Sequence, residues 1–209
     1  MLKRLISSIK TIAIITFSIF YVGLFHNAHV ALAAGLKDNA TTAEGSPATT
    51  RFLIISKGRV ADPLQQQQRG IDAVELITKA ANTLQPDAIV DSLAERAMTI
   101  EQYRRGQASE AVTGAIFRDR LKGLIDTAKA QDTVVIYTHS HGLRNGFEPS
   151  QPLGGMGMDL PVKRPIHGGA FLWDEYVDLI LSIPAKNIVV FTMACYSGGL
   201  VEYLNSQVA

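Results

Sequence analysis

Three short, uninterrupted apolar runs limit what this chain can fold into. They cover residues 51–56, 133–138 and 187–192, and they are rich in β-branched side chains. A run of that kind is typical of a strand that is buried on both faces of a parallel sheet. A shorter strand is expected at residues 88–90. The runs therefore predict an α/β domain built on a mostly parallel sheet.

Stretches with helical periodicity separate these runs. Residues 71–84 and 171–182 each place apolar side chains on one face of a helix. Thr113 is expected to cap a third helix that extends to about residue 130. Residues 57–69 are polar and contain a proline, so they are expected to form a loop. Strands that alternate with helices predict a three-layer sandwich with helices on both faces of the sheet.

The N-terminal segment has the features of a signal peptide. Basic residues precede an apolar run at 11–25, and the sequence Ala-Leu-Ala at 31–33 supplies two small residues, Ala31 and Ala33. The run is shorter than the roughly 20 apolar residues of a transmembrane helix. Residues 1–34 are therefore expected to be a cleaved signal peptide, with an uncleaved anchor as the alternative. Residues 35–50 are expected to form a flexible leader, and residues 51–209 the domain. The protein is expected to be periplasmic or secreted and to meet a membrane only through the signal segment.

Charge and cysteine content narrow the possible functions. The chain has 20 Lys and Arg, 19 Asp and Glu, and no basic block, so nucleic acid is not expected as a partner. Its one cysteine, Cys195, cannot form an internal disulfide. A lone thiol is often a small buried hydrophobic residue. Whether Cys195 is reactive therefore depends on its neighbours.

Two of the expected strands end in reactive residues. One continues into HSHG at 139–142 and the other into ACYSGG at 194–199. Parallel strands bring their carboxyl ends to the same edge of a sheet, so Cys195 and His141 are expected to lie close together. An imidazole can take the proton of a thiol, and the resulting thiolate attacks a carbonyl carbon. The backbone amides of Gly142 and Cys195 are candidate donors to the oxyanion that forms.

These motifs resemble those of the caspase, legumain, gingipain and clostripain peptidases. In that family one strand ends in His-Gly and a later strand in Ala-Cys-x-Ser-Gly or a close variant. The similarity covers roughly residues 51–204. It implies a caspase-like fold and a cysteine endopeptidase that needs no metal or organic cofactor and acts on a peptide or protein substrate. It also implies that Cys195 is the nucleophile, His141 the base and Gly142 part of the oxyanion hole.

The resemblance also suggests residues that bind substrate. The family often uses an arginine after the first strand, and Arg69 is its counterpart here. His139 is expected to line the pocket, and Met193 takes a position that is commonly acidic or amide in the family. Relatives continue with further strands beyond the cysteine, where 14 residues follow Cys195 in this sequence. Three explanations stay open: the sequence is a fragment, a second chain or a dimer completes the pocket, or the domain is an inactive remnant.

Three alternatives remain open at the level of sequence. The domain could be a catalytically degenerate caspase-like module that binds peptides or partners. Residues 138–142 also resemble the nucleophile elbow of serine α/β-hydrolases, but that motif needs a helix directly after it. The glycines and prolines of residues 142–169 instead predict a long loop. His139 and His141 have the spacing of zinc ligands, but no further cluster of ligand residues is evident nearby.

Overall fold

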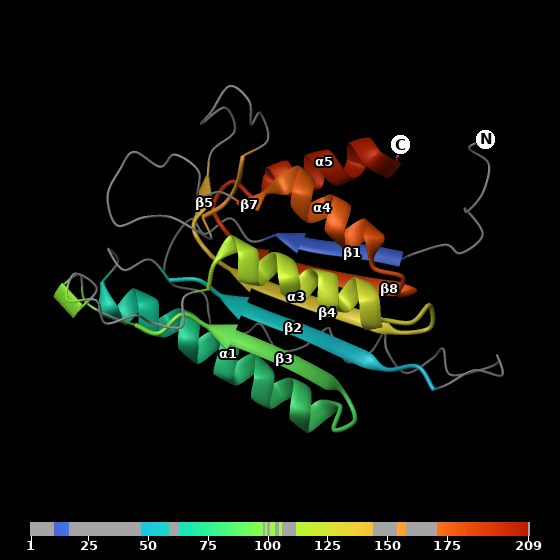
Figure 1. Cartoon of the computed structure of the whole chain (residues 1–209), viewed down its shortest axis with the longest axis horizontal. Helices are drawn as coiled ribbons and strands as arrows, with labels where there is room; N and C mark the ends of the chain where they lie inside the picture. The colour runs from blue at the N-terminus through green and yellow to red at the C-terminus, as the bar shows by residue number, and fades with distance from the viewer. Residues whose placement is uncertain are drawn as a thin grey trace.

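The central element is a five-stranded sheet in which all neighbouring strands are parallel, in the order β1-β8-β4-β2-β3 (Figure 1). The computed structural model describes residues 11–16, 47–58, 63–97, 99, 101–102, 105, 112–143, 154–157 and 171–208. The strands are β1 (Thr11–Thr16), β2 (Thr50–Ser56), β3 (Ile89–Ala94), β4 (Thr133–His139) and β8 (Asn187–Met193).

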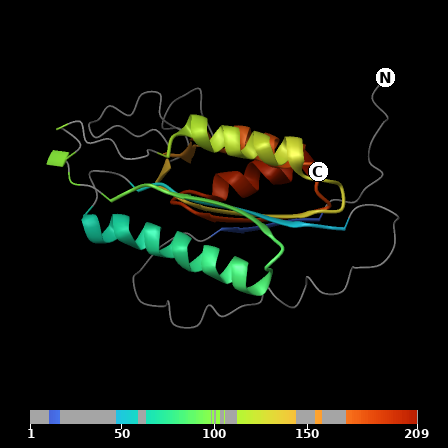
Figure 2. The same ribbon diagram turned by 60° about the horizontal axis from the view of Figure 1, so that its bottom comes forward.

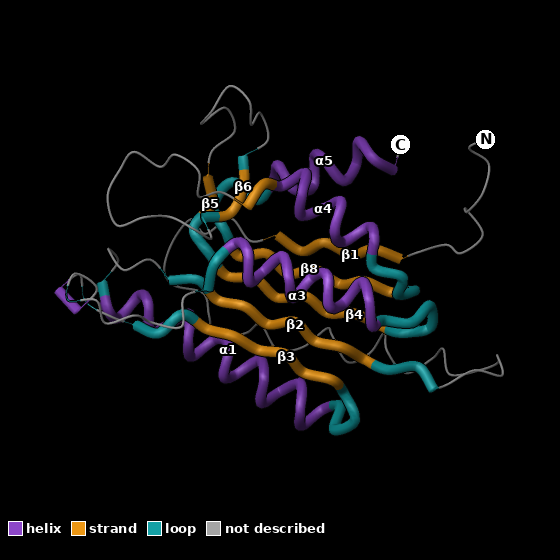
Figure 3. The backbone as a smooth tube through the Cα atoms, in the orientation of Figure 1, coloured by secondary structure: helices purple, strands orange, loops and turns teal. Residues whose placement is uncertain are grey.

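Helices cover both faces of this sheet, as Figure 2 shows. One face is covered by α1 (Leu64–Leu84). The other face packs against α3 (Gly114–Thr127), α4 (Trp173–Ser182) and α5 (Gly198–Val208). The predicted three-layer α/β sandwich is therefore confirmed. A small antiparallel sheet of β5 (Gly142–Leu143), β6 (Gly155–Met156) and β7 (Phe171–Leu172) lies near the carboxyl end of the parallel strands (Figure 3).

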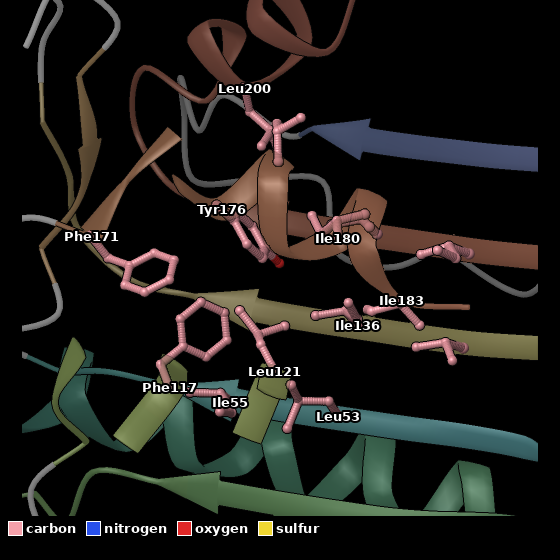
Figure 4. Packing of buried hydrophobic residues seen from close by; sticks show 14 of the residues in the cluster. Leu53, Ile55, Phe117, Leu121, Ile136, Phe171, Tyr176, Ile180, Ile183 and Leu200 are labelled. Atoms are coloured by element: carbon pink, nitrogen blue, oxygen red, sulfur yellow. The ribbon is translucent and has the colours of Figure 1, made fainter. Parts of the chain in front are cut away.

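Each strand sends alternate side chains to the two faces, as the pleat requires. Leu53 and Ile55 of β2 belong to the larger core, beneath α3 and α4, while Phe52 and Ile54 pack with α1. The larger core contains aromatic rings from different elements, and the centroids of Phe117 and Phe171 lie 4.9 Å apart, edge to face (Figure 4). Burial on both faces explains why the strands are continuous apolar runs.

A buried carboxylate joins the amino ends of β2 and β4. Asp132 Oδ2 accepts a hydrogen bond from Arg51 Nε at 2.9 Å, and the Asp132 side chain also accepts from the backbone amides of Thr49 and Lys129. Burial on its own raises the pKa of Asp132, but these hydrogen bonds and the Arg51 charge outweigh burial and hold that pKa below its ordinary value. The contact with Thr49 extends the domain slightly into the expected leader, and β2 itself begins at Thr50.

Several element boundaries differ from those expected from the sequence. The loop predicted at 57–69 is wrong for its second half, because α1 begins at Leu64. Glutamine is a good helix former, and Pro63 stands just before the first turn, where a missing amide costs little. Strand β3 continues to Ala94, although its second half is partly polar. The capping of α3 is confirmed, because Thr113 Oγ1 accepts from Ile116 N at 3.2 Å.

The N-terminal region contains one described element. Residues 11–16, from the apolar run of the expected signal peptide, form β1. The other residues of the 1–34 segment lie outside the described part of the chain, so the signal peptide stays a prediction. Among the described residues, no helix has both the length and the apolar character needed to cross a membrane.

Candidate active site

The carboxyl ends of β4 and β8 lie side by side. The two strands pair in parallel from Thr133 opposite Asn187 to His139 opposite Met193. The pairing continues one step beyond the strands, because Ser140 N donates to Met193 O at 3.1 Å. The two motif segments therefore leave the sheet at the same edge, as the sequence predicted.

Gly142 packs directly against the peptide backbone of Cys195. A Cβ placed on Gly142 would overlap the carbonyl group of Cys195 and lie only 2.7 Å from Cys195 N. Real Cβ atoms essentially never approach other atoms to within 3.0 Å. Only glycine fits at this position, so the Gly that follows His141 is what lets the two segments meet.

Cys195 lies in the turn between β8 and α5, and its side chain is exposed. The turn is tight: Tyr196 has a φ of 58°, and Gly199 N donates to Tyr196 O. A bulky residue in the left-handed region is uncommon and costs on the order of 1 kcal/mol or more. Cys195 is thus an exposed residue at a strained strand-to-helix turn.

His141 lies between β4 and β5 and is half-buried. Its carbonyl oxygen accepts a hydrogen bond from Gly157 N at 2.7 Å, which ties it to the small antiparallel sheet. The next residue, Gly142, contacts Cys195. His141 and Cys195 therefore occupy the same edge of the main sheet, on adjacent segments whose backbones touch.

A second polar contact forms beside this edge, between β2 and β4. Ser56 and His139 end these strands opposite one another, and Ser56 Oγ lies 2.9 Å from His139 Nδ1. Gly70 of α1 packs against this pair, because a Cβ there would overlap Ser56 Oγ and lie 3.0 Å from His139 Nδ1. A glycine inside a helix costs about 1 kcal/mol relative to alanine, and the close approach of α1 explains its presence.

The position of this pair in the topology is also informative. After β2 the chain passes to α1 on one face, whereas after β4 it reaches α4 on the opposite face. The gap between β2 and β4 is therefore a topological switch point, the place where open α/β sheets bind their ligands. Ser56 was not singled out by the sequence motifs. The signal that would have found it is the register of β2 against β4, because each of these two apolar strands ends in a polar residue.

A buried ion pair continues the polar edge towards β3. Lys57 Nζ lies 2.7 Å from Glu95 Oε2, and the two side chains are 12% and 4% exposed. The same Glu95 oxygen accepts from Val112 N at 2.7 Å, and Lys57 N donates to His139 O. These contacts join the ends of β2, β3 and β4 to the start of α3.

The residues expected to bind substrate are placed around the same edge. His139 and Met193 are register partners, and Arg69 lies exposed on α1 beside Gly70. Met193 is half-buried, and Tyr137 Oη donates to its sulfur at 3.4 Å. Burial raises the pKa of Tyr137 to about 12, so the phenol keeps its proton and can donate.

The alternatives based on Ser140 and on zinc are less well matched by the structure. Ser140 is 7% exposed and is followed by the short strand β5 rather than by a helix. The strand-to-helix turn lies at Cys195 instead. Among the residues that the structure describes, no group of three or more His, Cys, Asp or Glu side chains is placed to hold a metal ion.

Comparisons with protein-family models, with curated proteins and with solved structures found no match. The resemblance to the caspase and legumain peptidases therefore depends on the two sequence motifs alone.

Proposed function

We propose that this protein is a cysteine endopeptidase that hydrolyses peptide bonds with Cys195 and His141. The observation that carries the proposal is the contact between Gly142 and the Cys195 backbone. It brings the residue after the histidine against the cysteine itself, from segments more than 50 residues apart in the sequence. The exposure of Cys195 at the sheet edge adds support, because a nucleophile must reach its substrate.

The proposed reaction proceeds in two steps. His141 takes the thiol proton, and the Cys195 sulfur attacks the carbonyl carbon of the scissile bond. The oxyanion forms hydrogen bonds with the backbone amides of Gly142 and Cys195. The C–N bond then breaks as His141 gives its proton to the leaving amine, which leaves a thioester. Water, deprotonated by His141, hydrolyses the thioester and restores the thiol.

We further propose that the substrate binds beside Cys195, at the carboxyl ends of β2 and β4. His139, Met193 and Arg69 lie near the switch point between β2 and β4, where ligands bind in sheets of this type. They would contact the side chain next to the cleaved bond. The proposal also includes an exported location, a peptide or protein substrate, and a second chain or a dimer that completes the pocket.

The test is hydrolysis of a mixed peptide library by purified wild-type protein and by matched variants. Cys195→Ala should abolish cleavage with the fold kept, as checked by circular dichroism. His141→Ala should lower the rate by about 10²–10⁴-fold and more than His139→Ala does. Unchanged turnover in Cys195→Ala would refute the assignment, and a larger loss in His139→Ala would move the base to that residue. Absence of cleavage by wild-type protein would favour the catalytically degenerate binding module.

A further inference from the structure

Tyr196, the residue after Cys195, combines a strained backbone with an exposed position. It is the only non-glycine residue with a positive φ in the part of the chain that the structure describes. Glycine, asparagine and aspartate adopt this conformation at lower cost than an aromatic residue does. Packing inside the protein does not explain the choice of tyrosine, because Tyr196 is 54% exposed. Strained residues cluster at functional sites, so the ring itself calls for a functional explanation.

The neighbours of Tyr196 fix its place on the surface of the turn. Ser197 is fully buried, and its carbonyl oxygen accepts from Leu200 N at 3.1 Å, which anchors the turn to α5. On the other side of Tyr196, Cys195 is exposed. Open space adjoins the turn at Gly198, where an added Cβ would meet no atom within 4 Å. Cys195 and Tyr196 therefore lie side by side on an accessible surface.

The composition of this segment favours an apolar ligand. Residues 187–201 include no Asp, Glu, Lys, Arg or His. A tyrosine ring offers a large contact area at a low cost in side-chain entropy, and aromatic rings attract one another in offset or edge-to-face contacts. We propose that Tyr196 is a specificity-determining residue, which contacts an aromatic side chain of the substrate beside the bond that Cys195 attacks. This inference rests on the proposed function for the nature of the substrate, but the ring contact itself is measured without turnover.

Alkylation of Cys195, the one thiol of the chain, tests the ring contact without peptidase activity. The two probes are iodoacetamide and its N-phenyl derivative, which differ by one aromatic ring. The ratio of the N-phenyl rate to the iodoacetamide rate should be about three- to tenfold higher in folded wild type than in urea-unfolded protein. Tyr196→Phe should keep that gain, and Tyr196→Ala should lose it. Equal gains in wild type and Tyr196→Ala would overturn the inference.

A glycine variant separates the ring from the backbone strain. Tyr196→Gly removes both, whereas Tyr196→Ala removes the ring and leaves a side chain at a positive φ. Tyr196→Gly should therefore melt about 2–4 °C above Tyr196→Ala, while both lose the N-phenyl preference equally. If Tyr196→Gly kept the preference, the ring would not be its source and the inference would fail.

Peptide hydrolysis distinguishes this inference from the proposed function. For wild type, peptides with Phe beside the cleaved bond should have a KM about three- to tenfold lower than matched peptides with Ala. Tyr196→Ala should remove that difference with kcat within about twofold, and Leu76→Ala, which changes an exposed leucine of α1, should match wild type. Equal KM values for the two wild-type substrates would sink the inference and leave the peptidase intact. An N-phenyl preference without any peptide cleavage would support the ring contact and sink the peptidase.

Discussion

The contact between Gly142 and Cys195 makes a sharp prediction for Gly142→Ala. The added Cβ would overlap the Cys195 carbonyl and crowd Cys195 N at 2.7 Å, so the two segments must separate by on the order of 1 Å or more. Backbone atoms cannot rotate away as a flexible side chain can. Overpacking of this kind costs about 1–3 kcal/mol, which corresponds to a melting temperature lower by about 2–12 °C in a domain of this size.

The same separation of the two segments should lower the rate of peptide hydrolysis more than it lowers the stability of the fold. A displacement of about 1 Å between reacting groups can cost about 10²-fold in rate. We therefore expect Gly142→Ala to lose about 100-fold in peptide hydrolysis while it still folds. The assay is kcat/KM on the best library peptide, together with thermal unfolding followed by circular dichroism.

A matched control lies in the same region. Gly198 begins α5, three residues after Cys195, and a Cβ added there would meet no atom within 4 Å. Gly198→Ala should therefore melt within about 2 °C of wild type, or slightly higher. If Gly142→Ala and Gly198→Ala have the same melting temperature and the same activity, Gly142 does not pack against the Cys195 backbone.

Two further predictions concern the polar contacts at the ends of the sheet. Gly70→Ala should lower the free energy of unfolding in urea by about 1–2 kcal/mol. The loss should be smaller in a Ser56→Ala background, because Ser56→Ala removes the oxygen that the new methyl group would overlap. Equal losses in both backgrounds would contradict the packing of Gly70 against Ser56. Asp132→Asn should cost about 3 kcal/mol near neutral pH, because it breaks a buried pair with Arg51. The pKa of Asp132 is lowered by folding, so this carboxylate stabilises above the ordinary carboxyl value of about 3.9, and the difference from wild type should shrink as the pH falls through the lowered pKa. A difference that stayed constant down to pH 2 would show that the charge is not the cause.

The strands were predictable because each one is marked by a short apolar run in its own sequence. Burial on both faces selects continuous β-branched runs, and the runs at 51–56, 133–138 and 187–192 match β2, β4 and β8 to within one residue at each end. The cap of α3 was equally readable, since Thr113 stands before an amphipathic stretch. The meeting of the two motif segments at one edge followed from parallel pairing alone.

Elements that form only because of tertiary contacts were harder to predict. The first two turns of α1 are mostly exposed glutamines, so no apolar periodicity marks them. Helix α5 was not expected, because it begins with two glycines, which favour loops in isolation. It is stabilised by burial of Leu200 and Leu204 in the main core. Strand β1 was interpreted only as a targeting segment, because a short apolar run supports both roles.

The contact between Ser56 and His139 shows a further limit of motif-based prediction. The sequence indicated His139 as a residue that lines the pocket. Strand β4 ends at His139, and the His139 ring faces Ser56 beneath α1. The partner could be identified only from the register of β2 against β4, which no local pattern fixes.

Alkylation of Cys195 is the most decisive experiment on the proposed pairing of Cys195 with His141, because no other thiol competes in this chain. The measurement is the rate of reaction with iodoacetamide from pH 5 to pH 9, in full-length wild type, His141→Ala and His139→Ala. His141→Ala should slow labelling near neutral pH by about tenfold or more, and His139→Ala should have a smaller effect. Equal labelling rates in wild type and His141→Ala across the whole pH range would contradict the pairing of Cys195 with His141.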